Sequence, residues 1–169
     1  MQGSLILVSF RQRCSLFLAT GFFLSYVPYA IAHRFFNPKK DTGAGFVGTL
    51  WGVLTLPFFP SQAYTGGWTL ISGILFSVVI SDIAEHFLRS HDDSRIVIDE
   101  WIGYWCSMYW LPHTFIYISM SFIFFRLFDI YKAPWVKKVS YLPGGWGIVM
   151  DDVIAGFMAN GLLQCLKHL

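Results

Sequence analysis

The pattern of charged and apolar residues in the stretch 99–129, DEWIGYWCSMYWLPHTFIYISMSFIFFRLFD, decides the fold. Its uncharged run, 101–125, is 25 residues long and has charged residues at both ends. As one straight helix this run would be about 37 Å long and would place its charged ends on opposite faces of a bilayer. Pro112 lies near its middle, and the residue before a proline disfavours helix. We therefore predict a helical hairpin that turns at 111–113 and brings both charged ends to the same depth.

Two further uncharged runs, 14–32 and 42–81, contain 19 and 40 residues. Each is close to or beyond the roughly 20 residues that cross a bilayer core. With 55% hydrophobic and only 13% charged residues, the composition excludes a disordered chain. We predict an all-α, polytopic membrane bundle of helical hairpins with a polar site near one membrane face, formed by a single domain over 1–169 that begins with a basic tail, 1–13.

Proline and glycine divide the longest run into two predicted helices. Pro57, Pro60, Gly66 and Gly67 supply the residues of the expected turn. Before that turn, the small residues at 48 and 52 are spaced for close helix packing.

Three further expectations concern the ends of the chain. The run 14–32 is expected to be retained, to dip into the membrane and to return, so that the basic clusters beside it and Lys137-Lys138 face the cytoplasm with the site. After a linker rich in proline and glycine, a last helix is expected from near Asp151 to Cys165, with two acids in its first turn.

Charge and cysteine content exclude several classes of function. A net charge of +2 is too small to attract polyanions, so no nucleic-acid partner is expected. The three cysteines lie far apart in apolar stretches, which indicates neither a disulfide framework nor a zinc cluster.

Nine of the ten acidic residues fall between positions 82 and 152. One group has the spacing of a solvated connecting helix with Glu-Arg pairs: Asp82, Glu85, Arg89, Asp92, Asp93 and Arg95. The other acids lie next to long apolar helices, where ionisable groups mark a site by default. These are Asp99, Glu100, Asp129, Asp151 and Asp152. Carboxylate oxygens without a Cys/His set favour Mg²⁺ over zinc.

Cations accompany these acids. Arg126 and Asp129 are three residues apart and share a helix face, so they could present a phosphate-binding fork beside a metal ligand, or simply pair with each other. Lys132 follows one turn later. The glycines of 144–147 form a flexible turn whose amides could receive phosphate oxygens. No Walker lysine or dinucleotide fingerprint is present, so ATP or NAD binding is not supported.

Three blocks, in the same order, resemble the phosphatidylglycerophosphatase A family, small membrane phosphatases of bacterial phospholipid synthesis. Residues 94–103, SRIVIDEWIG, are similar to the family's "IVxDExxG" segment, and residues 125–132, FRLFDIYK, to its "FRxFDxxKP" segment. Residues 144–156, GGWGIVMDDVIAG, are similar to its "GIMxDDxxAG" segment. AGFVGT at 44–49 stands where the family has an "APGTxGS" turn, after a basic insertion, 33–41.

The resemblance implies Mg²⁺-dependent hydrolysis of phosphatidylglycerophosphate to phosphatidylglycerol and phosphate at the bacterial cytoplasmic (inner) membrane. It implies catalytic roles for Asp129, Asp152, Arg126 and Lys132, substrate binding by Arg126, Lys132, Gly145, Gly147 and Thr49, and metal binding by Asp99, Glu100, Asp129, Asp151 and Asp152. The nucleophile is either a water molecule or one of the aspartates. The partners implied are the lipid substrate and the bilayer.

Two other classes of function compete with this interpretation. An ion- or proton-coupled membrane carrier would also place carboxylates inside a helical bundle. A non-catalytic assembly subunit would account for the glycine and aromatic packing, but not for the clustered acids. Phosphate release from a lipid distinguishes the enzyme from both.

Overall fold

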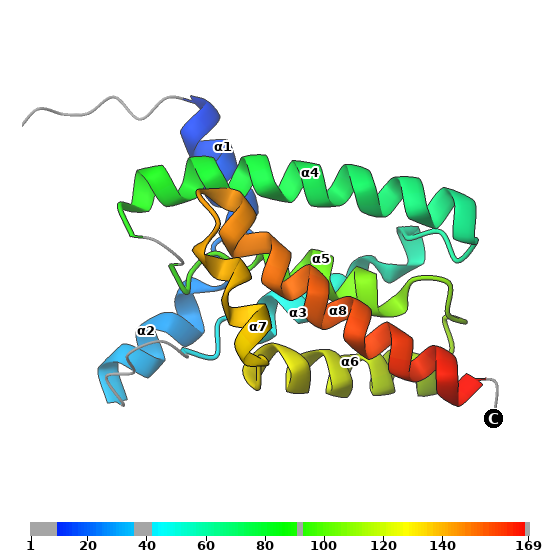
Figure 1. The fold of residues 1–169 in the computed structure, drawn as a ribbon. Coiled ribbons are helices and arrows are strands. Elements are labelled where there is room, and N and C mark those ends of the chain that lie inside the picture. Colours follow the sequence, from blue (N-terminus) through cyan, green and yellow to red (C-terminus); the bar gives the residue numbers. More distant parts are fainter. Residues whose placement is uncertain (1–9, 36–41, 91–92, 168–169) are drawn as a thin grey trace, which may run out of the picture.

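The computed structural model describes residues 10–35, 42–90 and 93–167, and this part of the chain is all-helical, as predicted (Figure 1). Residues 1–9 of the predicted basic tail and residues 36–41 of the basic insertion lie outside the described part. The α-helices are α1 (Phe10–Ala19), α2 (Tyr26–Phe35), α3 (Gly45–Thr55), α4 (Ala63–Leu88), α5 (Ile98–Met108), α6 (Phe115–Ile130), α7 (Pro134–Lys137) and α8 (Gly145–Lys167), with 3-10 turns η1 (Leu56–Phe58) and η2 (Val139–Tyr141).

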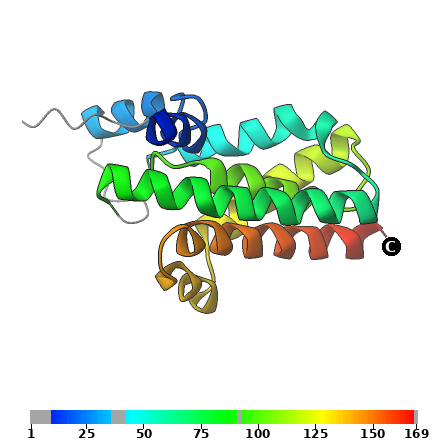
Figure 2. The ribbon, with the colours of Figure 1, turned by 90° about the horizontal axis from the view of Figure 1, so that it is seen from above.

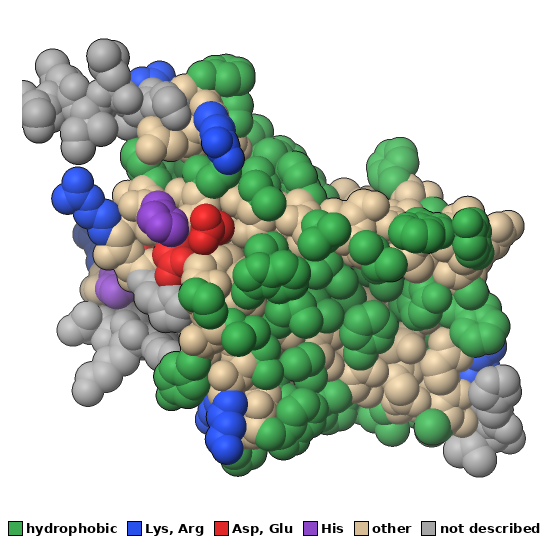
Figure 3. Space-filling view, turned by 45° about the horizontal axis from the view of Figure 1, so that its top comes forward, with side chains coloured by type: hydrophobic (Ala, Val, Ile, Leu, Met, Phe, Trp, Pro, Cys, Tyr) green, Lys and Arg blue, Asp and Glu red, His purple; other side chains and the backbone are tan. Residues whose placement is uncertain are grey.

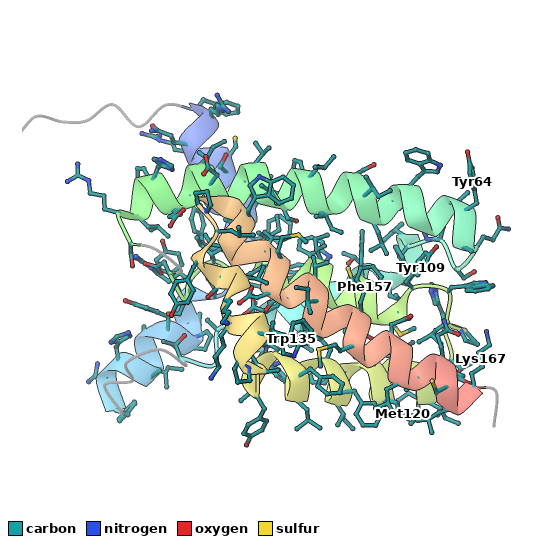
Figure 4. The ribbon with its side chains drawn as sticks, viewed as in Figure 1. Tyr64, Tyr109, Met120, Trp135, Phe157 and Lys167 are labelled. Carbon is teal, nitrogen blue, oxygen red and sulfur yellow. The ribbon has the colours of Figure 1, made fainter. Side chains whose placement is uncertain are left out.

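The predicted hairpin around Pro112 is confirmed, because α5 and α6 pack side by side and the turn between them contains that proline. The Tyr104 hydroxyl of α5 donates to the Ile118 carbonyl of α6 at 3.1 Å. From α8, the Asn160 amide donates to the carbonyl of Tyr109 at 2.6 Å, and the Tyr109 ring meets Phe157 edge-on (Figure 4). Helix α8 therefore satisfies backbone groups at the turn and holds the hairpin closed.

Helices α5 and α8 approach each other closely at two glycines. A Cβ atom on Gly156 would overlap the carbonyl oxygen of Gly103, and one on Gly103 would lie 2.9 Å from the carbonyl oxygen of Asp152. Small residues at such a crossing let two helix backbones come together. Since Asp99 lies one turn before Gly103, the same contact brings the start of α5 next to Asp152 of α8.

Replacing Gly156 by alanine should therefore push α8 away from α5. We expect a loss of about 1–3 kcal/mol in stability from overpacking. Because a shift of about 1 Å at a catalytic site can cost about 100-fold in rate, we also expect turnover to fall by about that factor. Thermal unfolding in detergent and steady-state kinetics measure the two effects. The matched control is Gly161→Ala, also on α8, where an added Cβ would meet nothing within 4 Å; equal effects of the two substitutions would contradict the packing argument.

The run 42–81 contains two helices, α3 and α4, as predicted, and Gly48 and Gly52 pack closely against the α5 region. The prediction that Gly66 and Gly67 belong to the turn is wrong, because α4 already begins at Ala63. A Cβ on Gly66 would lie 2.7 Å from the carbonyl oxygen of Pro60. Because Gly66 has no side chain, the first turns of α4 can pack against the backbone of the turn that precedes them.

The prediction that the last helix begins near Asp151 is also wrong, since α8 begins at Gly145. A Cβ at Gly145 would overlap the Val78 carbonyl of α4. The glycines that resemble a turn in the sequence thus form the first turn of a helix packed against α4. Asp151 and Asp152 lie beyond that first turn, so the expected interaction with the helix dipole does not apply to them.

The interpretation of residues 82–95 as a solvated connecting helix is wrong for its second half. Helix α4 ends at Leu88, and Asp93 and Arg95 lie beyond it. The Asp93 side chain is only 8% exposed and accepts two hydrogen bonds from the Arg95 guanidinium, at 2.6 and 2.8 Å. Asp92 lies outside the described residues.

Two described helices, α4 and α8, are long and apolar enough to cross a membrane. The first uncharged run is divided, because α1 ends at Ala19 and α2 begins at Tyr26, with three consecutive positive φ angles at Gly21, Phe22 and Phe23 between them. Hydrophobic side chains cover much of the face shown in Figure 3, whereas most of the charged ones visible there gather at one end. This distribution is typical of a bundle surrounded by lipid with a polar site at one end.

Candidate active site

A cavity of about 800 Å³ lies where the starts of α5 and α8 meet the end of α6. All seven charged residues that the sequence predicts for the site line it: Asp99, Glu100, Arg126, Asp129, Lys132, Asp151 and Asp152. They come from three segments of the chain, and the closed hairpin is what brings the first two segments together. The predicted convergence of these segments is thus present in the structure.

Three of these carboxylates form a compact group that could hold one metal ion. Oxygens of Asp99, Glu100 and Asp152 all lie within 4.8 Å of one another. Asp99 and Asp152 are buried, and the buried atoms Asp99 Oδ1 and Glu100 Oε2 have no hydrogen-bond partner within the described ranges. Burying carboxylates this close together is costly unless a cation or protons compensate. The group is a set of hard oxygen donors with unused ligand atoms, which fits Mg²⁺.

Lys132 forms ion pairs with three of the site carboxylates, one of which, Asp152, also belongs to the compact group. Its ammonium lies 2.7 Å from Asp151 Oδ2, 2.8 Å from Asp152 Oδ1 and 3.1 Å from Asp129 Oδ1. Burial by itself lowers the pKa of Lys132, but the three carboxylates outweigh it and hold that pKa above its ordinary value. Arg126 donates to Asp129 Oδ2 at 2.6 Å, so the Arg126–Asp129 pair that the spacing allowed is formed.

The structure therefore separates the five predicted metal ligands into two sets that share Asp152. Asp99, Glu100 and Asp152 have the geometry of an ion site, whereas Asp129 and Asp151 are ion-paired with Lys132. Among the residues that the structure describes, six carboxylates and three Lys or Arg side chains line the cavity. This excess of negative charge would repel a phosphate group unless additional cations entered with it.

Three predicted substrate-binding residues do not line the cavity: Thr49, Gly145 and Gly147. The Thr49 hydroxyl is buried within α3 and donates to the Gly45 carbonyl at 3.1 Å. The Gly145 amide donates to Asp82 Oδ1 of α4 at 3.4 Å, so this amide is not directed at the cavity. A role for these three residues stays a prediction that the geometry does not support.

Sequence reasoning missed several residues of the cavity wall. Gly45 contributes to the wall directly beside the charged groups, because a Cβ there would overlap the Glu100 carboxylate and lie 2.9 Å from Arg126 Nη1. The sequence feature that could have identified Gly45 is its position in the AGFVGT block at 44–49. Tyr29, His33 and Lys137 also line the cavity, and no spacing in the sequence connects them with the acids.

The sequence model of the family described as phosphatidylglycerophosphatase A matches residues 17–167. Phosphatidylglycerophosphatase A of Escherichia coli is 30% identical over 129 residues, which are 72% of this chain and 74% of that protein. A putative phosphatidylinositol-3-phosphatase of Bacteroides thetaiotaomicron is 31% identical over 147 residues, 82% of this chain and 84% of that protein. Phosphatidylglycerophosphatase A of Haemophilus influenzae is 28% identical over 137 residues, 78% and 81% of the two chains. No solved structure matches.

Proposed function

This chain belongs to the phosphatidylglycerophosphatase A family, and we propose that it hydrolyses phosphatidylglycerophosphate to phosphatidylglycerol and inorganic phosphate with Mg²⁺ as cofactor. The observation that carries the proposal is the convergence of the carboxylates, Arg126 and Lys132 from three segments in one cavity. The three sequence blocks that resemble the family contain all seven of the charged site residues: Asp99, Glu100, Arg126, Asp129, Lys132, Asp151 and Asp152.

The surroundings of the cavity suit a lipid substrate. Large hydrophobic side chains on α4 and α6 are exposed, among them Leu75, Phe76, Ile116 and Ile123. Exposed apolar side chains on long apolar helices are expected where a protein faces lipid. The acyl chains of the substrate could therefore stay in the bilayer while its terminal phosphate enters the polar cavity.

The protein's own side chains would perform three tasks. Asp99, Glu100 and Asp152 would hold Mg²⁺, which when bound would neutralise negative charge on the phosphate oxygens. Arg126 and Lys132 would donate hydrogen bonds to these oxygens. Asp129, which accepts from both cations, would keep their donor groups oriented toward the cavity.

The attacking nucleophile is a water molecule or an aspartate. Asp129 and Asp152 are the predicted catalytic carboxylates, and both lie within contact of Lys132. Hydrolysis in ¹⁸O-labelled water under single-turnover conditions separates the two routes. Direct attack by water labels the released phosphate and forms no covalent intermediate. The aspartyl route passes through an acyl phosphate that can be trapped. Its hydrolysis at phosphorus labels the phosphate, whereas its hydrolysis at the carboxyl carbon labels the aspartate instead.

The proposed substrate is a membrane lipid, so it also indicates where in the cell the protein acts. We propose a multi-pass protein of the bacterial cytoplasmic membrane whose cavity opens toward the cytoplasm. The support is the presence of cations around the cavity and on the neighbouring segment 137–138, because cytoplasmic surfaces of membrane proteins are rich in lysine and arginine.

The experiment that tests the proposed function is phosphate release by the purified protein in nanodiscs with Mg²⁺. We expect equal amounts of phosphate and phosphatidylglycerol from phosphatidylglycerophosphate. Phosphatidylinositol 3-phosphate is the comparison substrate, since the Bacteroides relative is named a putative phosphatidylinositol-3-phosphatase. Preference for that lipid would replace the proposed substrate, and release of no phosphate from either lipid would favour the carrier or the assembly subunit.

A further inference from the structure

The cavity wall also includes a polar region, made of two groups of residues, that has no task in the proposed reaction. It is formed by Tyr29 and His33 of α2 and by Lys137, Ser140 and Tyr141 of the α7–η2 segment. In Figure 2, α2 and the α7–η2 segment lie on opposite sides of the bundle, so these residues come from two separate walls. The region contains hydroxyl groups, an imidazole and an ammonium but none of the five predicted metal ligands.

Lys137 differs from the other two cations of the cavity. Arg126 and Lys132 are both paired with carboxylates. Lys137 forms no ion pair with any residue that the structure describes. Of these three described cations, Lys137 is therefore the one with no carboxylate within ion-pair distance.

Ring and cation–π contacts stabilise the wall of the cavity formed by Tyr29 and His33 of α2. The Tyr29 and His33 rings pack with centroids 4.4 Å apart, and the Arg95 guanidinium lies 5.2 Å from the Tyr29 centroid. Burial by itself raises the pKa of Asp93, but hydrogen bonds from Arg95 outweigh it and hold that pKa below its ordinary value. Asp93 therefore stays an anion at neutral pH. Because Asp93 also interacts electrostatically with His33, the α2 wall already has an anion near its imidazole, in contrast to the wall that carries Lys137.

The proposed substrate carries two phosphates of different chemistry. A terminal phosphomonoester is the group that is removed, and a phosphodiester links the head glycerol to the diacylglycerol. Once the monoester lies at the carboxylate group, the glycerol and the diester must occupy another part of the same cavity. The Lys137 ammonium, which has no carboxylate partner among the described residues, is suited to bind this singly charged phosphate.

We infer that Lys137 binds the phosphodiester of the lipid headgroup and so determines which phosphomonoester lipids the enzyme accepts. This inference rests on the proposed function, because it assigns the part of the headgroup that is not cleaved. It concerns any lipid with a diester between its acyl chains and its scissile phosphate. Phosphatidic acid, whose phosphate is joined directly to diacylglycerol, lacks that diester.

The test compares Lys137→Ala with Lys138→Ala in nanodiscs of one lipid composition. The two substitutions remove the same charge from adjacent positions, but Lys138 does not line the cavity. We expect Lys137→Ala to raise KM for phosphatidylglycerophosphate about 10-fold, as loss of one charge-assisted hydrogen bond does, with kcat changed little. Its kcat/KM for phosphatidic acid with the same acyl chains should stay within twofold of wild type, and Lys138→Ala should leave both substrates unchanged.

Several results would overturn the inference. An equal effect of Lys137→Ala and Lys138→Ala would assign the effect to the general charge of the membrane surface. An equal loss of kcat/KM for phosphatidic acid would show that Lys137 does not recognise the diester. An unchanged KM for phosphatidylglycerophosphate would exclude contact of Lys137 with the headgroup. If the wild-type enzyme instead prefers phosphatidylinositol 3-phosphate, which also contains a diester, the proposed substrate fails. The Lys137→Ala comparison on that lipid then decides the inference separately.

Discussion

Replacing Asp152 by asparagine is expected to reduce kcat for phosphatidylglycerophosphate by about 1,000-fold, the loss typical of removing a preorganised charged group from a catalytic site. Asp152 is the carboxylate that both halves of the site share. Its oxygens lie with those of Asp99 and Glu100, and one of them accepts from Lys132 at 2.8 Å. Asparagine keeps the shape of the side chain but removes the negative charge, so the ion site and the lysine contact weaken together.

The matched control for this substitution is Asp82→Asn. Asp82 lies on α4, outside the cavity lining, and its amide replacement can still accept from the Gly145 amide. We expect Asp82→Asn to retain turnover within about threefold, in the range of surface substitutions. Both variants are measured as purified, monodisperse protein with thermal unfolding recorded beside the kinetics. A folded Asp152→Asn enzyme with turnover close to wild type would remove Asp152 from the site.

Removal of divalent cations is expected to abolish phosphate release, and addition of Mg²⁺ should restore it. Without a cation, the excess of carboxylates in the cavity would oppose the entry of a phosphate group. Mg²⁺ should also raise the unfolding temperature of the wild-type protein, because a ligand that binds only the native state stabilises it. The measurement is phosphate release and thermal unfolding of enzyme treated with chelator, before and after Mg²⁺ is added.

The control for the effect on stability is Asp99→Asn, whose unfolding temperature should respond much less to Mg²⁺. Full turnover in the presence of chelator would contradict the assignment of a metal to this site. Loss of turnover that Mn²⁺ restores as well as Mg²⁺ would keep the site but broaden the choice of ion, since both prefer oxygen ligands.

The part of the fold that the sequence could predict is the part governed by local rules. A 25-residue apolar run interrupted by Pro112 can adopt few folded conformations. The hairpin follows because the residue before a proline disfavours helix. In such a hairpin, Glu100 lies 12 residues before Pro112 and Arg126 lies 14 residues after it, so the two side chains are at similar depth. Convergence of the charged groups could therefore be predicted before any coordinates.

The errors come from glycines, whose roles depend on packing between distant segments. Gly66 and Gly145 were interpreted as turn residues, but both lie inside helices where another backbone comes too close for a side chain. The same conformational freedom that favours glycine in turns permits its use at such contacts. A single sequence does not distinguish the two uses, so the start of α8 was placed six residues too late.

The walls of the cavity were missed for a related reason. Asp93 was interpreted as solvated because residues 82–95 have the spacing of a connecting helix with Glu-Arg pairs. Its environment is set by Arg95, which lies over the rings of Tyr26 and Tyr29 from a helix about seventy positions earlier in the chain. Such tertiary contacts leave no periodic signal, in contrast to the three acidic blocks.

The most direct test of the central claim, that α5 and α8 together build a divalent cation site, is Mn²⁺ binding measured by electron paramagnetic resonance. Wild type and Asp82→Asn should each bind Mn²⁺ tightly, whereas Asp99→Asn and Asp152→Asn should lose that binding. A second group of possible ligands, Asp82, Glu85 and His86 on the last turns of α4, is less buried than Asp99 and Asp152 and provides the rival site. Loss of tight binding in Asp82→Asn, with binding unchanged in Asp99→Asn and Asp152→Asn, would contradict the account.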